Sequence, residues 1–354
     1  MLATSLRNAS RMATVCSPFS KAVVRCIQKM YPESLADKSF DNTGLLLEAP
    51  LNKHRRLKNS VLLTVDLTKA VADEAIARGD SIIIAYHPII FRGLKSLTLA
   101  NSQQQSLLRL AQEGISVYSP HTAVDATPGA MADWLCQCAV PSSLQPRPSK
   151  ETIYPSPDPP VDPDFKDAGM GRKITFEQPL PLNDIIGAIA KTALPQSNVI
   201  GTHTESSAVG FSIAIPQGST VSDITISSVA ACPGSGSSIL MKNGTPAADL
   251  LLTGELSHHE ALAAIEAGSV VVTLSHSNSE RGFLQRYMRS NLHERLSQVW
   301  KEVCAHNDLA SSDRDESEVQ VLKQIFADDS VCVDVSKSDR DPYQVLCWRN
   351  GREA

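Results

Sequence analysis

Continuous apolar runs of strand length alternate along the chain with longer segments in which apolar residues recur at helical spacing. Residues 60–66 and 81–86 are rich in Val, Ile and Leu, and residues 67–78 between them carry Ala, Val and Ile at helical spacing before Gly79. Buried strands separated by helices of about 10–15 residues are typical of βαβ units. The pattern predicts an α/β protein with parallel or mixed sheets that helices cover on both faces.

The same alternation extends into the second half of the chain. A helix ending at Gly114 precedes a strand over 115–119, and a helix over 258–268 ends in glycine before another strand. The further elements that the pattern predicts are strands over 172–176, 249–255, 269–274 and 330–335 and a helix over 182–193.

Proline and polar residues mark the expected domain boundaries. Residues 141–163 hold eight prolines among Ser and Asp, which excludes a helix or a central strand there. We therefore expect two α/β lobes joined by a surface linker, and a loop insertion at about 305–318. The expected division is an extension over 1–17, an N-terminal lobe over 18–140, a proline-rich linker over 141–167 and a C-terminal lobe over 168–354.

Composition narrows the classes of function. The 354 residues suffice for about two domains, and a hydrophobic content of 42% is that of a globular protein with a core. The net charge of -5 and the pI near 6.0 argue against a nucleic-acid partner, which usually requires clustered Lys and Arg. No apolar run approaches the roughly 20 residues that cross a bilayer, so no membrane span is expected.

Cysteines and the N-terminus bear on the compartment. The eight cysteines form no Cys-x-x-Cys pair, so we expect free thiols in a reducing compartment. The first 30 residues contain five basic residues, no acidic one and many Ser and Ala, a composition typical of a mitochondrial transit peptide. Helical spacing already begins near Pro18, which leaves a short disordered cytosolic tail as the alternative. The expected localisation is mitochondrial or cytoplasmic.

Histidines and acidic residues gather where the apolar runs end. His87 follows one run, and His276 and Glu280 follow another. The carboxyl ends of parallel strands form the ligand-binding edge of an α/β sheet, and imidazole with carboxylate suits Zn, Fe, Mn, Co or Ni. The pattern predicts a metal site in which two ions about 3.5–4 Å apart could activate a water molecule. The other residues at strand ends are Asp66, His121, Asp125, Glu255, His258 and His259.

Each of these residues also has a purely structural interpretation. Ser277 and Glu280 have the spacing of a capping box, and Asp66 could cap the helix that follows it. His258 and His259 could be solvent-exposed residues of a first helical turn, and His87 could bond backbone carbonyls at a turn. These alternatives would scatter histidines over both ends of the strands, whereas five of the nine follow a strand.

Five segments at these positions resemble the NGG-interacting factor 3 family, also called the Nif-like family, whose bacterial members are described as type 2 GTP cyclohydrolase I-like proteins. They occur in the order found in the family and extend from about residue 18 to 350. The segments are SFDNTGLL at 39–46, YHPIIF at 86–91, HTAVD at 121–125, TGELSHH at 253–259 and HSNSERG at 276–282.

The resemblance implies two linked α/β lobes with mixed sheets, a dinuclear metal site in the cleft between them, and a ring-like homohexamer. The ligands that it implies are His87, Asp125, His276 and Glu280. Many members have two adjacent histidines where this chain has Tyr86 and His87. A neutral phenol is a weak ligand, so the site would hold either one or two divalent ions.

The resemblance also suggests roles for neighbouring residues. Glu255, His258 and His259 would lie near the cleft and serve in proton transfer or in orienting the ligands, and His121 would orient the loop that carries Asp125. These roles describe a metal-dependent hydrolase of unknown substrate. GTP is suggested only by the name of the bacterial proteins, since the chain has no P-loop. The glycine-rich residues 233–238 could bind an anion or form a tight turn.

Two further functions fit the same residues. The chain could be a metal-containing scaffold or regulatory interaction protein without turnover, as the family name records a protein interaction. It could also store or deliver metal. A scaffold need not place several titratable residues beside its metal, whereas a hydrolase does.

Overall fold

The chain forms two compact units, each built around a mixed sheet. The computed structural model describes residues 15–52, 54–193, 199–200, 208–306, 316–343, 348–349 and 352–353. Unit 1 comprises Met1–Glu33, Lys38–His121 and Tyr287–Asp339. Unit 2 comprises Ser34–Asp37, Thr122–Arg286 and Arg340–Ala354. The expected architecture of two α/β lobes with mixed sheets is confirmed.

The units differ from the lobes that the sequence suggested. Tyr287–Asp339, expected in the C-terminal lobe, belongs to unit 1, because its strand pairs with a strand near the start of the chain. The expected linker contains an edge strand of unit 2 at Ser149–Pro155. Of the expected extension over 1–17, residues 1–14 lie outside the described residues, as do residues 307–315 of the expected loop insertion.

The sheet of unit 1 has the order β1-β4-β3-β2-β15. The four strands β4, β3, β2 and β15 run parallel, and β1 runs antiparallel to β4 at one edge. The central strands are buried along their whole length, as their continuous apolar sequence predicts. The strands are β1 (Gly44–Leu47), β2 (Ser60–Thr64), β3 (Ile82–Ala85), β4 (Ser116–Ser119) and β15 (Cys332–Val335).

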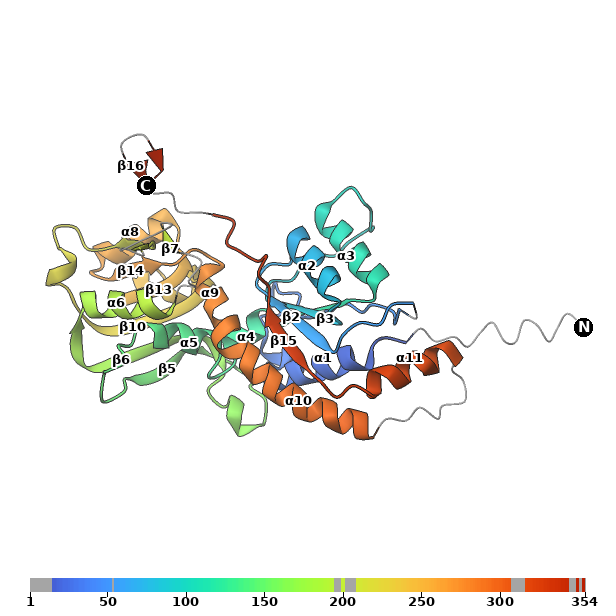
Figure 1. The fold of residues 1–354 in the computed structure, drawn as a ribbon. Helices are drawn as coiled ribbons and strands as arrows, with labels where there is room; N and C mark the ends of the chain where they lie inside the picture. The colour runs from blue at the N-terminus through green and yellow to red at the C-terminus, as the bar shows by residue number, and fades with distance from the viewer. Residues whose placement is uncertain are drawn as a thin grey trace, which may run out of the picture. The chain divides into compact units, whose positions relative to one another are not determined.

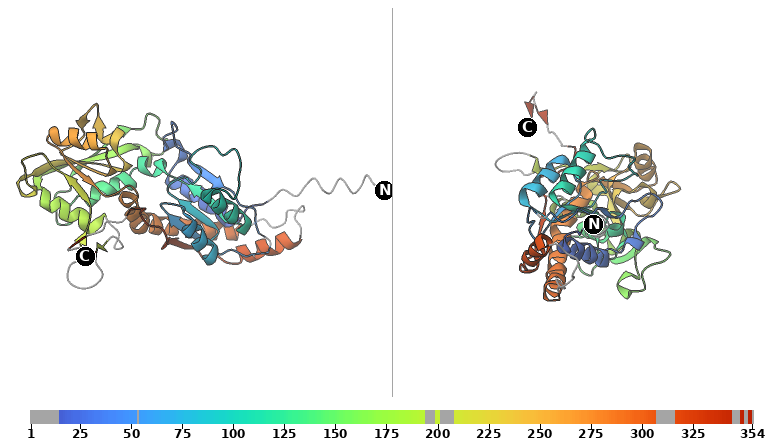
Figure 2. Two further views of the ribbon diagram at one scale, coloured as in Figure 1. Left: turned by 90° about the horizontal axis from the view of Figure 1, so that it is seen from above. Right: turned by 90° about the vertical axis from the view of Figure 1, so that its right-hand side faces the viewer.

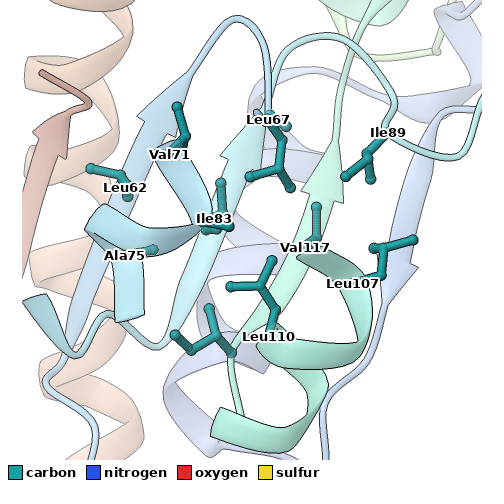
Figure 3. Packing of buried hydrophobic residues seen from close by; sticks show 12 residues of the cluster. Leu62, Leu67, Val71, Ala75, Ile83, Ile89, Leu107, Leu110 and Val117 are labelled. Atoms are coloured by element: carbon teal, nitrogen blue, oxygen red, sulfur yellow. The ribbon is translucent and has the colours of Figure 1, made fainter. Parts of the chain in front are cut away.

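Helices cover both faces of this sheet. The helices α2 and α3 lie side by side on one face, and α1 and α10 pack together on the other (Figure 1, Figure 2). Figure 3 shows the core beneath α2 and α3, where Leu62, Ile83 and Val117 project from three neighbouring strands. The helices are α1 (Pro18–Met30), α2 (Lys69–Arg78), α3 (Ser102–Glu113), α10 (Arg289–Ala305), α11 (Glu316–Phe326) and the 3-10 turn Glu33–Leu35.

The sheet of unit 2 has the order β5-β6-β10-β13-β14-β9. The three strands β10, β13 and β14 are parallel, and antiparallel strands flank them on both sides. The parallel strands Leu250–Glu255 and Val270–Thr273 confirm the predicted runs. The strands are β5 (Ser149–Pro155), β6 (Gly169–Pro181), β9 (Ser212–Ala214), β10 (Thr225–Ser235), β13 (Leu250–Glu255) and β14 (Val270–Thr273).

Two helices pack on one face of this sheet. Leu240 of α7 and Ala264 of α8 join a core with Leu251 of β13 and Val271 of β14, whereas α5 packs against β6 and β10. The helices are α4 (Thr122–Ala126), α5 (Met131–Cys138), α6 (Leu182–Thr192), α7 (Ser237–Leu240), α8 (His258–Glu266) and α9 (Asn278–Phe283). The short hairpin strands are β7 (Val199–Ile200) with β8 (Ala208–Val209), β11 (Met241–Lys242) with β12 (Thr245–Pro246), and β16 (Trp348–Arg349) with β17 (Arg352–Glu353).

Two global expectations can be compared with the described residues. Seven of the cysteines fall in this part of the chain, and all seven are free thiols. No helix within the same residues has the length and the apolar character needed to cross a bilayer.

Candidate metal centre

In unit 1, a carboxylate from one strand end orients a histidine from the next. His87 follows β3 and Asp66 follows β2, and because these strands are parallel neighbours both residues leave the sheet at the same edge. His87 Nδ1 lies 2.9 Å from Asp66 Oδ1. The helix α2 is capped by the side chain of Thr68, which accepts from the amide of Val71. The interpretation of Asp66 as the helix cap is therefore wrong, and the carboxylate faces the imidazole instead.

A second pair of the same kind lies beside the first. His121 Nδ1 lies 2.6 Å from Asp41 Oδ1, and the Asp41 side chain is completely buried. The ring centroids of His121 and His87 are 5.5 Å apart. His121 has a φ of 32°, a region that costs energy for residues other than glycine and is enriched at functional sites. The fold of unit 1 thus holds two imidazoles together, each with a carboxylate at Nδ1.

Tyr86 occupies the space next to both imidazoles. Its ring is 5.0 Å from that of His87 and meets the His121 ring edge to face at 5.4 Å. The side chain is buried, with 2% of its surface exposed. The residue directly before His87 is therefore a packed aromatic ring and not another imidazole.

In unit 2, His276 lies between two carboxylates. Its Nδ1 is 2.9 Å from Glu255 Oε1, and its Nε2 is 3.6 Å from Glu280 Oε1. Glu255 ends β13 and His276 follows the parallel neighbour β14, which brings the two to one edge of the sheet. Ser275, directly before the histidine, has a φ of 69°. Glu280 is only 1% exposed, and burial of a carboxylate is costly unless a cation or hydrogen-bond donors stabilise it.

The space beside this pair exists because residue 234 is a glycine. A Cβ on Gly234 would lie 2.9 Å from Glu280 Oε1 and 3.0 Å from His276 Nε2, and the residue has a φ of 60°. Gly254 is equally constrained, since a Cβ there would lie 2.6 Å from the carbonyl oxygen of Gly234. The glycine-rich segment includes the tight turn that the sequence suggested, since the Ile239 amide donates to the Gly236 carbonyl oxygen, and binding of an anion stays a prediction. The segment runs at the end of β10 and leaves room where the nitrogen and oxygen atoms converge.

Asp125 also belongs to unit 2. It lies in α4, and its charge acts on the thiol of Cys232 in β10. Burial raises the pKa of the Cys232 thiol, and the negative charges of Asp125 and Glu280 raise it further. Asp125 and Glu280 are two of the four expected ligands, and both belong to unit 2.

The structural alternatives at the remaining residues have mixed outcomes. Ser277 makes no side-chain capping bond to α9; its hydroxyl instead donates to Asp341 Oδ2, so the capping interpretation is wrong. A capping box does occur at Ser257 and Glu260, at the start of α8. His258 and His259 are exposed in that first turn, with ring centroids 5.4 Å apart.

Three histidines thus share one arrangement, in which a carboxylate oxygen lies at Nδ1. When a neutral imidazole donates its Nδ1 proton to a carboxylate, the lone pair of the ring is at Nε2. Histidines that ligate metals commonly have this arrangement, which fixes the ring and raises its basicity. The donor set of imidazole and carboxylate fits a borderline divalent ion better than Ca²⁺ or Mg²⁺.

Sequence analysis identified the strand-end residues but not all of their partners. The role of Asp41 was missed because it is 80 residues from His121. Gly234 was noticed only as part of a glycine-rich segment. Glu255 was expected in proton transfer or in orienting a ligand, and its contact with His276 Nδ1 fits the second role. The sequence could have indicated the roles of Asp66 and Glu255, because each ends or follows a strand that is the parallel neighbour of the strand before the histidine.

Comparison with known proteins relates these features to one family. Residues 20–308 match the family model of Duf34/NIF3 (NGG1p interacting factor 3). The Protein NIF3 homolog of Schizosaccharomyces pombe is 41% identical over 83% of this chain and 95% of its own length. NGG1-interacting factor 3 of Saccharomyces cerevisiae is 38% identical over 78% of this chain and 91% of its own.

Solved structures share the fold at lower identity. A Bacillus cereus protein related to NIF3 is 16% identical, with a TM-score of 0.64 over 95% of this chain and 100% of its own. Reduced HcgD from Methanocaldococcus jannaschii is 19% identical, with a TM-score of 0.52 over 91% of this chain and 98% of its own.

Proposed function

The chain belongs to the Duf34/NIF3 family, and on that premise we propose that it binds a divalent metal through His87, Asp125, His276 and Glu280. The observation that carries the proposal is the pair His276 and Glu280, whose facing nitrogen and oxygen atoms converge over Gly234. His87, His276 and Glu280 each offer a ligand atom of the kind that such ions prefer.

Neighbouring carboxylates orient two of the proposed ligands. Asp66 holds His87 through Nδ1, and Glu255 holds His276 in the same way. Because Glu280 is buried, a cation beside it would offset the cost of burying the carboxylate. The metal would be Zn, Fe, Mn, Co or Ni, with one or two ions per chain. Tyr86 favours the lower number, because its neutral phenol is a weaker ligand than an imidazole at that position would be.

The activity that we propose is metal-dependent hydrolysis of a substrate that is still to be identified. A bound divalent ion would supply a hydroxide nucleophile near neutral pH and polarise the attacked group. The residues of the chain contribute orientation and proton transfer. Glu255 holds His276 through Nδ1, and His258 and His259 at the exposed start of α8 could exchange protons with water. A GTP cyclohydrolase-type reaction remains one candidate to test.

Metal content tests the site directly. Purified wild type, His87→Ala and His276→Ala would be measured by mass spectrometry after dialysis against each of the five metals. A site that needs both histidines predicts that either substitution removes at least about 90% of the bound metal. His293→Ala, an exposed histidine on α10, is the matched control. Unchanged metal content in both site variants would refute the proposal.

Turnover is tested separately. The metal-loaded wild type would be screened against nucleotides, phosphoesters and cyclic amides, with Glu280→Ala as the control for contaminating activity. We expect any genuine activity to fall at least about 100-fold in this variant. Activity that persists in Glu280→Ala would have to arise elsewhere.

A non-catalytic role is the second candidate function. The Saccharomyces cerevisiae relative is named an interacting factor, which supports a metal-containing scaffold or regulatory protein with a protein partner. Metal storage or delivery is the third. A chain that binds metal but turns over none of the screened substrates would favour these roles.

Assembly and location complete the proposal. We propose that the chain forms a homo-oligomer, which the family resemblance suggests is a hexamer. Light scattering would measure the mass of the assembly. For location, we propose mitochondria or cytoplasm. A fluorescent fusion with and without residues 1–17 would distinguish the two compartments.

A further inference from the structure

The strand β1 is an open edge of the sheet in unit 1. It pairs with β4 on one side, and no strand within the described residues pairs with its other side. The backbone of an edge strand presents N–H and C=O groups on which another extended chain can pair. Leu45, in the middle of β1, leaves 39% of its surface exposed.

A cavity of about 200 Å³ lies between this edge and helix α1. Ser20, Val24 and Gln28 line it from α1 at intervals of four residues, and Leu45 lines it from β1. Residues four apart lie on one side of a helix, so α1 presents a continuous stripe to the cavity. An engineered apolar cavity of about 150 Å³ holds a benzene molecule, so this one has room for a side chain as large as Leu or Phe.

The charges at the rim are predominantly basic. Lys21 and Arg25, one turn apart on α1, both line the cavity and both are exposed. Glu48 is the one carboxylate among the lining residues. The cations therefore outnumber the anions, which favours an acidic group in whatever occupies the cavity.

From these observations we propose that β1 and α1 form a docking site for an extended, acidic segment of a partner protein. The segment adds to the free edge of β1 as a short strand, with one apolar side chain in the cavity and a carboxylate near Lys21 and Arg25. In this mode backbone hydrogen bonds provide affinity and alternate side chains provide specificity. The four-residue length of β1 and its shift of register between Leu45 and Leu47 limit the added strand to a few residues.

The site stands apart from the proposed metal centre. All residues that line the cavity belong to unit 1, and none of them is a proposed metal ligand or a partner of one. A substitution in one site can therefore abolish metal binding without affecting peptide binding, and the reverse. The failure of one proposal would not be mistaken for the failure of the other.

The test selects peptides from a random eight-residue library on the full-length wild-type chain, after depletion on Arg25→Glu. We expect enriched peptides to carry Asp or Glu and to alternate apolar with other residues. Their dissociation constants should rise at least about 10-fold on Arg25→Glu and on Leu45→Lys. Lys29→Glu, on α1 but outside the cavity lining, should bind as the wild type does.

Backbone methylation identifies the binding mode. N-methylation at one set of alternate peptide positions should abolish binding, and methylation at the other set should leave it, because a paired strand presents alternate amides to each edge. Peptides without acidic enrichment, binding indifferent to Leu45→Lys, or methylation effects without alternation would each overturn the proposal. A change of oligomer mass in Leu45→Lys would identify the edge as a contact between copies of this chain, which also overturns it.

Discussion

At the scale of single residues, backbone conformation controls the space available to the candidate ligands. Gly234 has a positive φ and lies against His276 Nε2 and Glu280 Oε1. Gly244 also has a positive φ, of 78°, but a Cβ there would meet nothing within 4 Å. Substituting either glycine would strain the backbone, but only a Cβ at Gly234 would also approach the atoms of proposed ligands. Comparing the two substitutions therefore distinguishes the effect of strain from the effect of steric contact in the site.

We expect Gly234→Ala to lower metal affinity at least about 10-fold, because the added methyl group would displace His276 or Glu280. A left-handed conformation costs an alanine about 1–2 kcal/mol, and Gly244→Ala carries that cost alone. Isothermal titration with Zn²⁺ would measure both variants, and circular dichroism would confirm their folding. Equal losses of affinity in the two variants would show that strain, and not the site, is responsible.

Tyr86 directly precedes the proposed ligand His87 and offers a phenol where a histidine would offer an imidazole. Tyr86→His is expected to raise the number of metal ions bound per chain, since it supplies a second nitrogen ligand beside His87. Metal-to-protein ratios by mass spectrometry would measure the change, with Tyr154→His in unit 2 as the control. An unchanged ratio in a folded Tyr86→His variant would mean that this position does not limit the metal count.

At the scale of helices and strands, the sequence predicted those elements that depend on local patterns of residues. The strand Ile82–Ala85 and the helix Lys69–Arg78 follow from continuous apolar residues, helical spacing and the terminal Gly79. Capping was harder to assign, because Ser257 and Ser277 both have Glu three residues later, yet only Ser257 forms the box. A distant partner at residue 341 binds the Ser277 hydroxyl, and no local pattern reports it.

The capping box of α8 can be tested by local exchange. Ser257→Ala removes the side-chain acceptor for the Glu260 amide and should cost about 1 kcal/mol. We expect amide hydrogen exchange in the first turn of α8 to accelerate about 5-fold. Ser290→Ala, within α10, should leave α8 unchanged. Protection of α8 that is identical in Ser257→Ala and wild type would contradict the assigned cap.

At the scale of the whole molecule, pairings between distant segments decide which residues belong together. The strand β15 pairs with β2 across about 270 residues of sequence, with Cys332 opposite Ser60. Arg78 also connects these distant segments, since it forms ion pairs with both Asp80 and Asp334. Periodicity within a segment predicts a strand but not its neighbour, which is why the sequence placed this region in the wrong lobe. The proposed ligands His87 and His276 could be selected from the sequence because each follows a predicted strand, whereas Asp125 and Glu280 lie in short helices.

The ion pair between Arg78 and Asp334 predicts that the stability of unit 1 depends on pH. The guanidinium of Arg78 holds the pKa of Asp334 below its usual range. A carboxylate with a depressed folded-state pKa stabilises the fold above its unfolded-state pKa of about 3.9, and the contribution is lost as the pH falls through the folded value. Asp334→Asn should therefore destabilise unit 1 at pH 7 by up to about 1 kcal/mol.

The difference between Asp334→Asn and wild type should shrink below about pH 4. Urea midpoints, followed by the fluorescence of Trp300 in unit 1 with the other tryptophans replaced, would measure it. Asp329→Asn, an exposed neighbour, is the control. A difference that stays constant with pH would mean that the pair does not contribute.

The interleaving of the two units has a consequence for synthesis on the ribosome. Residues 122–286 form most of unit 2 and leave the exit tunnel before Tyr287–Asp339 has been made. Domains usually fold as units during synthesis, so the sheet of unit 2 can be complete while that of unit 1 still lacks β15. We therefore expect unit 2 to fold before unit 1 on the ribosome. Premature termination after residue 286 should damage unit 1, although that unit contains the start of the chain.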